Sequence, residues 1–422
     1  MKKSALFTKD FTILVVGQII SLFGNSILRF SLSLFVLDKT GSAAVFGGIL
    51  AVSMIPTILL SPFGGILADR VNRRNIMVTL DFSTALLIAV YTAFFAGSGS
   101  LAPITVTMIL LAVIQSFYQP SVQASIPVLA NDENLERANG AVIQVNALAN
   151  LVGPIIGGFL YGFLGIQPIL LASGVCFFIS AVMEIFLRIP FAPQEQKGGL
   201  FRTVKDDFGS ALRFVVKENP RLFQLLGVLA ALNLFLSSLI TVGLPYLIKV
   251  YLGLSSQHYG FAEGALALGS ILGGVFAGLA AKRFDFRHSY QLLILSGAAM
   301  APIGLAVLTN SAPLISYGII LIAVLACMCC ATLFNIFAQS FAQRQTPEQL
   351  LGKVSSLITV ICICAYPVGQ SFYGLLFDRF QNQVSYIVFF GCAASLLVAF
   401  AAGKIQRTIP VSHGEQSAQA AE

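Results

Sequence analysis

Four ionisable side chains interrupt long apolar stretches of this sequence, and their chemistry is the first feature to explain. They are Arg29, Asp81, Glu184 and Glu263. A charged group inside an apolar helix is costly, so such residues usually bind a ligand, carry a proton or pair with one another. Asp81 and Glu184 lie near the ends of their stretches, where a structural pair with a nearby Arg or Lys is favoured. Arg29 and Glu263 lie deeper and are the candidates for coupling or substrate binding.

Two interpretations of Arg29 and Glu263 stay open. In the first, Glu263 carries a transported proton, and Arg29 adjusts its protonation or meets an anionic group of a substrate. In the second, the two residues form a fixed buried ion pair that holds parts of the protein together. Neutral isosteres separate the two: lost activity with normal expression favours the first, and lost protein favours the second.

Neutral polar residues share one helical face with Arg29. Gln18, Ser21 and Asn25 precede it at spacings of three and four, which places all four on one side of a helix. Further amides occur within other apolar stretches: Gln115, Gln144, Asn233 and Asn335. We expect this set to line a polar cavity, although each amide alone more often makes a hydrogen bond between helices.

The composition excludes an ordinary soluble protein. Of the 422 residues, 57% are hydrophobic and 10% are charged, and the mean hydropathy is +0.86. Soluble domains carry roughly a quarter charged residues, so this chain has too few to solvate a globular surface. The formal net charge of +7 comes from basic residues spaced between apolar runs, which argues against nucleic-acid binding.

Twelve apolar runs are long enough to cross a bilayer, which takes roughly twenty helical residues each. The predicted spans are 11–36, 43–68, 75–96, 101–124, 138–164, 168–188, 221–248, 257–281, 289–309, 313–342, 351–377 and 383–403. Each span must be helical, because an open strand edge in lipid would leave backbone groups without hydrogen bonds. The first run is far longer than a signal-peptide core and is predicted to be a retained span.

Lysine and arginine are distributed unevenly between the predicted loops, which predicts the orientation. With a cytoplasmic N-terminus, all but four of the 25 basic residues fall on the cytoplasmic side; the exceptions are Arg29, Lys39, Lys249 and Arg379. Positive loops stay in the cytoplasm, so both termini are predicted there. We expect a multi-pass protein of the plasma (inner) membrane.

The two halves of the chain repeat each other. Landmarks of the first half recur at one constant offset in the second: Gly47 as Gly260, Gly65 as Gly278, Arg70 as Arg283 and Pro154 as Pro367. The predicted fold is therefore an all-α membrane protein with twelve transmembrane helices in two pseudo-symmetric six-helix bundles. The predicted domains are an N-terminal bundle (1–188), a cytoplasmic linker with an amphipathic helix (189–220), a C-terminal bundle (221–404) and a cytoplasmic tail (405–422).

A charged loop follows the second predicted span. It contains Gly65, Asp69, Arg70, Arg73 and Arg74. The glycine permits close approach of neighbouring helices, and the carboxylate is suited to the positive N-terminus of a helix. The arginines can pair with acids or with lipid phosphates.

The fifth predicted span carries a stripe of small residues. Gly140 is followed by Gly153, Pro154, Gly157 and Gly158, which give a thin helix face and a position where the helix can kink.

These two motifs resemble those of the major facilitator superfamily. There the loop after helix 2 reads G-x-x-x-D-R/K-x-G-R-R/K, and helix 5 of antiporters reads G-x8-G-x3-G-P-x2-G-G. The resemblance implies a conformational latch in the loop and a rocker seam along helix 5; a purely topogenic loop and a general packing face are the alternatives. Asn72 and Ala149 each replace a motif Gly, and we expect Asn72 to be tolerated because Asn also adopts positive φ. In the second-half copy Lys282 replaces the Asp, so a latch there should be weaker.

Several further segments resemble the macrolide-efflux and enterobactin-exporter branch of that superfamily. They are the opening Gln18, Ser21 and Phe23-Gly24, then Asp38-Lys39-Thr40-Gly41-Ser42, and residues 119–127 and 134–140. The branch implies export of an amphipathic small molecule by alternating access, with a proton as the coupling ion. Proton antiporters of the family carry an Arg in helix 4 that residues 110–119 lack, so coupling is expected through Glu263. A lipid or lysolipid transporter and a transport-inactive membrane sensor are the alternatives.

Enzymatic and metal chemistry find no support in the sequence. The seven cysteines lie within apolar runs and lack histidine partners at metal-site spacing, so they are predicted to pack between helices. No nucleotide-binding loop or nucleophile motif accompanies the three histidines. We expect no enzyme activity, cofactor or metal, and a monomer whose partners are a small-molecule substrate, a proton and membrane lipid.

Overall fold

The computed structural model describes residues 8–95, 97–130, 134–190, 208–280, 286–309 and 311–407. Within these ranges twelve helical stretches are long and apolar enough to cross a membrane. The prediction of an all-α membrane protein with twelve spans is confirmed, and the predicted ends agree with the helices to within a few residues. Bilayer thickness sets the length of each apolar run, which is why hydropathy alone finds them.

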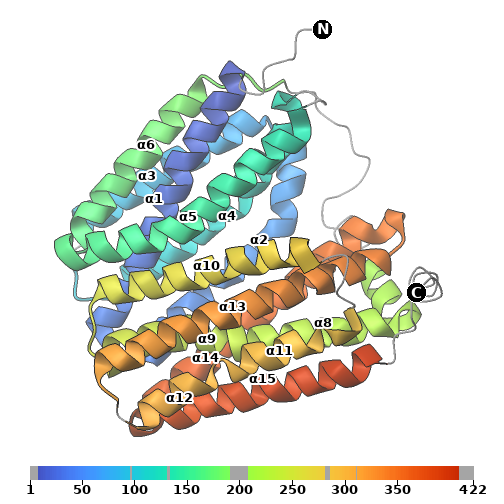
Figure 1. Cartoon of the computed structure of the whole chain (residues 1–422). Coiled ribbons are helices and arrows are strands. Elements are labelled where there is room, and N and C mark those ends of the chain that lie inside the picture. The colour runs from blue at the N-terminus through green and yellow to red at the C-terminus, as the bar shows by residue number, and fades with distance from the viewer. Residues whose placement is uncertain are drawn as a thin grey trace. The chain divides into compact units, whose positions relative to one another are not determined.

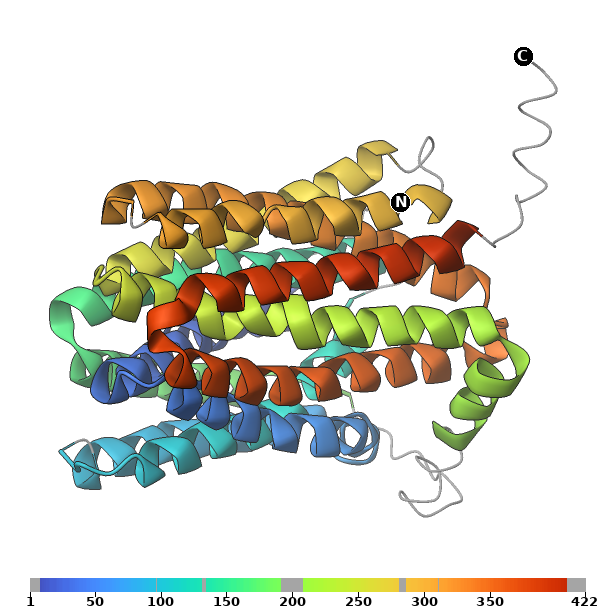
Figure 2. The same ribbon diagram turned by 90° about the horizontal axis from the view of Figure 1, so that it is seen from below.

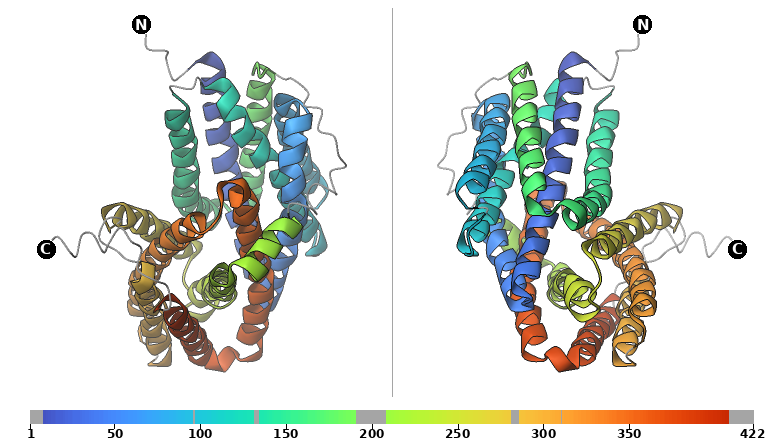
Figure 3. Two further views of the ribbon diagram at one scale, coloured as in Figure 1. Left: turned by 90° about the vertical axis from the view of Figure 1, so that its right-hand side faces the viewer. Right: turned by 90° about the vertical axis from the view of Figure 1, so that its left-hand side faces the viewer.

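The chain divides into two compact units. The first unit contains residues up to Asp207 together with Ile240–Ala267 and Tyr366–Gln381. Its first six helices are α1 (Lys9–Thr40), α2 (Ala43–Arg70), α3 (Arg73–Phe94), α4 (Ala102–Leu129), α5 (Leu135–Leu164) and α6 (Ile166–Ile185). Helix α1 packs against α5 and α6, α3 against α4 and α6, and α2 against α4 (Figure 1, Figure 3). The two units are defined by contacts between residues and contain segments from both halves of the chain. They do not test the predicted domain bounds, which stay a prediction.

The second unit contains Phe208–Leu239, Leu268–Ala365 and the chain from Asn382. Its helices are α8 (Pro220–Leu232), α11 (Tyr290–Ala298), α12 (Ala301–Leu308), α13 (Pro313–Arg344) and α15 (Val384–Arg407). Two long helices contribute to both units, α10 (Ser256–Ala280) and α14 (Leu351–Arg379). Within the second unit α15 packs against α8, α11 and α12, and Figure 2 shows α15 in red beside α8.

The seventh span is not a uniform α-helix. After α8 it widens into a π-helical turn, Asn233–Ser237, continues as α9 (Ser238–Pro245), and widens again over Tyr246–Tyr251. The first widening is accompanied by side-chain bonds to the backbone: Asn233 donates to the Leu229 carbonyl at 2.9 Å, and Ser238 donates to the Asn233 carbonyl at 2.8 Å. Such π-turns often mark functional positions, since they turn side chains out of the regular helical register.

The predicted amphipathic helix of the linker is only partly described. Residues 208–213 are helical and lead into a π-turn, Phe214–Glu218, whereas the earlier part of the predicted helix lies outside the described residues. Phe214 and Val215 are buried in the core of the second unit. Phe208 and Leu212, in the described part of this helix, are exposed.

Candidate functional site

The small-residue stripe of α5 faces two different helices. A side chain at Gly153 would overlap the Ser26 hydroxyl of α1, and a Cβ at Gly157 would lie 3.0 Å from the Phe30 ring. A Cβ at Gly158 would instead lie 2.8 Å from the Ser256 carbonyl oxygen of α10. The glycines of the predicted motif thus lie at two close helix crossings, one between α5 and α1 and one between α5 and α10.

The crossing of α5 and α10 is reciprocal. A Cβ at Gly260 of α10 would lie 2.9 Å from the Pro154 carbonyl oxygen of α5. Phe30 of α1 also stacks on Tyr259 of α10, with ring centroids 5.0 Å apart. All these residues belong to the first unit. A Cβ at Gly140, the first glycine of the motif, would meet no described atom within 4 Å, so this glycine takes no part in either crossing.

The loop between α2 and α3 ties the ends of three helices. Arg73 donates from Nε to the Ala68 carbonyl at 3.0 Å and lies 3.6 Å from the Asp69 carboxylate. Arg74 donates to the carbonyl of Ile185 at the end of α6. The predicted latch residues Asp69, Arg73 and Arg74 therefore hold a local network. Arg70 takes part in further interactions.

The predicted role of Gly65 in close helix packing is wrong. A Cβ at Gly65 would meet no described atom within 4 Å, whereas one at Gly64 would overlap the Ser116 carbonyl of α4. Neighbouring positions on a helix point about 100° apart, so a glycine pair in the sequence does not reveal which member faces the partner helix.

Gly64→Ala is expected to lower the stability of the folded protein by about 1–3 kcal/mol, the usual cost of overpacking against a rigid neighbour. The neighbour here is the α4 backbone at Ser116, which cannot rotate away as a side chain can. Thermal unfolding of purified protein in detergent measures the effect. Gly65→Ala is the matched control and should leave the midpoint unchanged. Equal midpoints for the two variants would contradict the assignment.

Asn72 does not use the positive φ that the missing motif glycine suggested. Its φ is −58°, and its side-chain oxygen accepts a hydrogen bond from the Arg74 backbone at 3.0 Å as the N-cap of α3. Asparagine is favoured at this position because its side chain satisfies an amide that the helix leaves free. Lys282 and Arg283, in the second-half copy of the loop, lie outside the described residues.

Asp81 and Glu184 do not pair with basic residues, contrary to the interpretation of the sequence. Within the described part of the chain neither carboxylate lies in an ion pair. Asp81 Oδ2 instead lies 2.8 Å from the Ser21 hydroxyl, which lies 2.7 Å from the Ser180 hydroxyl. The Tyr118 hydroxyl donates to Glu184 Oε1 at 2.7 Å. Both carboxyl groups are buried between α1, α3, α4 and α6.

The predicted polar face of α1 reaches this network. Gln18 donates to the Tyr118 hydroxyl at 2.9 Å, and Asn25 and Gln115 line a small cavity beside Asp81. Sequence spacing therefore located one side of the network. It missed Tyr118 and Ser180, although Ser180 and Glu184 are four residues apart and share a face of α6. Gln144 is exposed on α5.

Arg29 and Glu263 do not form the fixed ion pair that is one of the two interpretations. Among the described residues Glu263 accepts a hydrogen bond of 2.6 Å from the Tyr259 hydroxyl, one turn earlier on α10, and no salt bridge joins it to Arg29. The same Tyr259 stacks on Phe30, the neighbour of Arg29 in α1. Glu263 thus lies beside the α5–α10 crossing.

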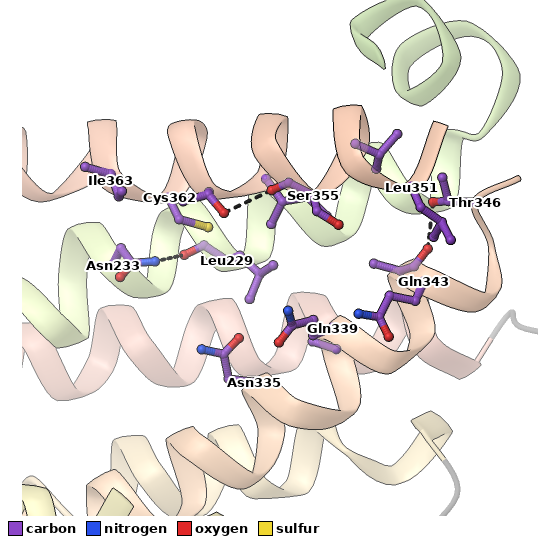
Figure 4. Close-up of a pocket in the computed structure, with 15 residues that line it drawn as sticks. Leu229, Asn233, Asn335, Gln339, Gln343, Thr346, Leu351, Ser355, Cys362 and Ile363 are labelled. Carbon is purple, nitrogen blue, oxygen red and sulfur yellow. Dashed lines mark hydrogen bonds between the residues drawn. The ribbon is translucent and has the colours of Figure 1, made fainter. Parts of the chain in front are cut away.

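A polar cavity of about 300 Å³ lies within the second unit, between the seventh span, α13 and α14. Figure 4 shows the amides Asn335, Gln339 and Gln343 following one face of α13 at spacings of four. No described residue hydrogen-bonds these three side chains. Opposite them lie Asn233 at the start of the π-turn and, on α14, Thr359. None of the lining residues is an acid, a lysine, an arginine or a histidine.

Two contacts that the sequence did not predict join segments far apart in the chain. The Asp378 carboxylate at the end of α14 accepts from the Ser42 hydroxyl and, at 2.7 Å, from the Ala43 amide at the start of α2. Lys249 lies 3.1 Å from Asp38 and donates to Ser256 at 2.8 Å. The segment Asp38–Ser42 marks a family branch in the sequence, but the sequence does not reveal the partners of these residues.

Comparisons with known proteins agree with this architecture. The family model described as Major Facilitator Superfamily matches residues 14–365. Macrolide efflux protein A of Streptococcus pyogenes is 25% identical over 393 residues, covering 90% of this chain and 92% of that protein. Enterobactin exporter EntS of Salmonella choleraesuis is 23% identical over 320 residues, covering 74% and 72%.

Solved structures of transporters share the fold. A bacterial homologue of the iron transporter ferroportin in an inward-facing state has a TM-score of 0.72 at 21% identity, covering 94% of this chain and 98% of that one. A D-xylose–proton symporter has a TM-score of 0.70 at 13% identity, covering 96% and 98%. At these identities the likeness concerns the fold alone.

Proposed function

The chain belongs to the Major Facilitator Superfamily, and from this we propose that it exports an amphipathic small molecule across the plasma membrane by alternating access. The two relatives named above are exporters by name, of a macrolide and of enterobactin. The glycine crossings of α5 give a seam at which helices can part and meet again. The proposed orientation, with both termini cytoplasmic, follows the distribution of basic residues.

The proposal on the substrate class rests on the cavity of the second unit, which amide side chains of α13 line. Asn335, Gln339 and Gln343 offer donors and acceptors that no described residue satisfies, so a bound molecule can take up those bonds. The absence of acids and bases among the lining residues disfavours a highly charged substrate, because an ion there would lose hydration without a counter-charge. Apolar neighbours such as Leu229 and Ile358 suit the carbon frame of an amphipathic, oxygen-rich compound.

Gln339→Ala is expected to weaken binding of such a compound about fivefold, the effect of one lost hydrogen bond of roughly 1 kcal/mol. Gln339 is the middle amide of the stripe, so most bound poses should contact it. The apparent affinity, measured by fluorescence polarisation of a labelled macrolide, tests this. Gln383→Ala changes an exposed amide in the 3₁₀ turn before α15, outside the cavity, and should bind as the wild type does. Unchanged affinity of Gln339→Ala would place the substrate elsewhere.

We further propose that a proton gradient drives export and that Glu263 takes part in the coupling. Its carboxyl accepts a hydrogen bond from Tyr259, which stacks on Phe30 across the α1–α10 contact, so a change in its charge acts on helices that must move. Arg29, in α1 next to Phe30, is the proposed contact for an anionic substrate group.

Export by cells expressing Glu263→Gln is expected to fall by about tenfold or more, within the usual range of coupling free energies. The measurement is efflux of a panel of macrolides, dyes, catecholate siderophores and lysolipids, with and without a protonophore. Glu348→Gln, an exposed acid between α13 and α14, is the control. Wild-type export that persists with the protonophore would contradict proton coupling. Export of no panel member at verified expression would contradict the exporter proposal.

A lipid or lysolipid transporter is the second candidate function, and one observation favours it. A groove between α3 and α6 is lined by apolar side chains apart from Thr92, including Phe82, Leu86 and Phe178. Such a groove can take an acyl chain but offers nothing for a polar headgroup. Selective export of the lysolipids in the panel would move the assignment to this function.

A further inference from the structure

Asp81 lies at one end of a chain of three oxygen–oxygen contacts that crosses three helices. Its Oδ2 lies 2.8 Å from the Ser21 hydroxyl of α1, and Ser21 lies 2.7 Å from the Ser180 hydroxyl of α6. Ser180 in turn lies 3.3 Å from the carbonyl oxygen of Gly17, one turn before Ser21 on α1. Each contact is a hydrogen bond only if one proton lies between its two oxygens.

Counting these protons assigns a protonation state to Asp81. The two serines supply one proton each, and the Gly17 carbonyl supplies none. If Asp81 is ionised, Ser21 must donate to it and Ser180 to Ser21, which leaves the contact with Gly17 without a proton. With a proton on Asp81, all three contacts are satisfied in one direction, from Asp81 through Ser21 and Ser180 to Gly17. We infer that Asp81 is a proton-binding site and holds its proton in this conformation.

The rest of the network also contains buried acceptors that lack a hydrogen-bond donor. Glu184 Oε2 and Gln18 Oε1 are buried acceptors for which the described residues provide no donor. Each of these two residues is only 1% exposed, so bulk water does not replace the missing donors. Unsatisfied buried acceptors are costly, and a proton or a proton-donating water is the ligand that removes the cost.

The groups facing Asp81 do not supply positive charge. Tyr118 of α4 and Glu184 of α6 face the same interior, and a second carboxylate there disfavours a negative charge on the first. Arg74, two turns earlier on α3, donates instead to the Ile185 carbonyl. No cation lies within 4 Å of Asp81 among the described residues. Two anions in one buried network without a cation would be strongly unfavourable, which agrees with a neutral Asp81.

A small polar cavity beside Asp81 offers the proton a path to this carboxyl group. The small cavity lined by Asp81, Asn25 and Gln115 provides polar partners on three helices, as a bound water requires. The chain of contacts ends at Gly17 of α1, and α1 packs against the glycines of α5 through Ser26 and Phe30. Movement of α1 would therefore break this chain of contacts and release the proton. This role in transport rests on the proposed proton-coupled function, whereas protonation of Asp81 does not.

Infrared spectroscopy of purified protein tests protonation without any transport. The wild type at neutral pH should show a carboxylic-acid carbonyl band that shifts in D₂O. Asp81→Asn should remove one component of this band in the difference spectrum against the wild type, whereas Glu348→Gln should remove none. A difference spectrum of Asp81→Asn without a lost carboxylic-acid component overturns the inference. If Asp81→Asn does not fold, Ser21→Ala should shift the band to the position of a carboxyl without a hydrogen bond, and an unshifted band overturns it.

Proteoliposomes test the role in coupling. Asp81→Asn should retain exchange of labelled substrate between the two sides and lose accumulation driven by a pH gradient. Accumulation at the wild-type level by Asp81→Asn overturns the coupling role. If the wild type itself shows no gradient-driven transport, the proposed function fails, while the infrared result still decides whether Asp81 binds a proton.

Discussion

Gly158→Leu is expected to abolish export while leaving the protein folded and in the membrane. Even a Cβ at this position would lie 2.8 Å from the Ser256 carbonyl oxygen, and Gly260 on the facing helix is equally confined. The obstacle is backbone on both sides, so no rotamer change relieves it. A leucine would force α5 and α10 apart and remove a state that the proposed cycle must visit. Efflux of a substrate identified in the panel, normalised to membrane protein, measures the loss.

Two further variants make this prediction specific. Gly158→Ala adds only the Cβ and should reduce export partially, since inserting one methyl group into a tight contact costs about 1–3 kcal/mol. Gly140→Ala changes another glycine of the same motif, where no described atom lies within 4 Å, and should export normally. Wild-type export by Gly158→Leu would show that the α5–α10 crossing is not part of the cycle.

The fold could be predicted from the sequence because the bilayer constrains it so strongly. Each span needs a long apolar helix, and the loops between spans carry most of the basic residues. The span from Pro220 to Tyr251 was found to within three residues at either end, yet its π-turn at Asn233 was not predicted. A π-turn adds one residue to a helical turn without changing composition, so hydropathy does not detect it.

The candidate sites were predicted less well, because sequence spacing gives the face of one helix and not its neighbour. Gln18, Ser21 and Asn25 were correctly placed on one face of α1, but the partners of Asp81 lie on helices far away in the chain. From the sequence, a nearby arginine or lysine is the expected partner of a buried acid. In the structure Asp81 contacts a serine hydroxyl and Glu184 a tyrosine hydroxyl instead. Asp81 is therefore a candidate proton site and not one half of a structural ion pair.

The same limit applies to Gly64 and Gly65. The motif shows that a small residue is needed near this point, and only the rotation of α2 against α4 decides which of the two glycines meets the Ser116 carbonyl. Asp38 to Ser42 is a comparable case. Its residues mark a branch of the superfamily in sequence, and their contacts with Lys249 and Asp378 become visible only when segments more than two hundred residues apart are placed together.

Asp378→Ala is expected to loosen the contact between the end of α14 and the start of α2. Its carboxylate accepts bonds from the Ser42 hydroxyl and the Ala43 amide and lies at the positive N-terminus of α2. Each hydrogen bond to a charged group contributes about 1.5–3 kcal/mol, so the loss of even one of the two should shift the population away from this contact by roughly 10- to 150-fold. Spin labels on cysteines at the exposed positions Lys39 and Phe380, in a background without the native cysteines, measure the change as a longer and broader distance distribution.

Asp10→Ala is the matched control for this change. The Asp10 carboxylate also accepts a bond from a backbone amide, that of Arg188 at 3.0 Å, but it joins two parts of the first six-helix segment away from Asp378. Its loss should leave the distance between the two labels unchanged. Lys249→Gln should give an intermediate result, because the Lys249–Asp38 pair is partly exposed and such pairs contribute less. An unchanged distribution in Asp378→Ala would show that the glycines at 47 and 374, which meet the backbones of Gln370 and Ala43, hold this contact without the carboxylate.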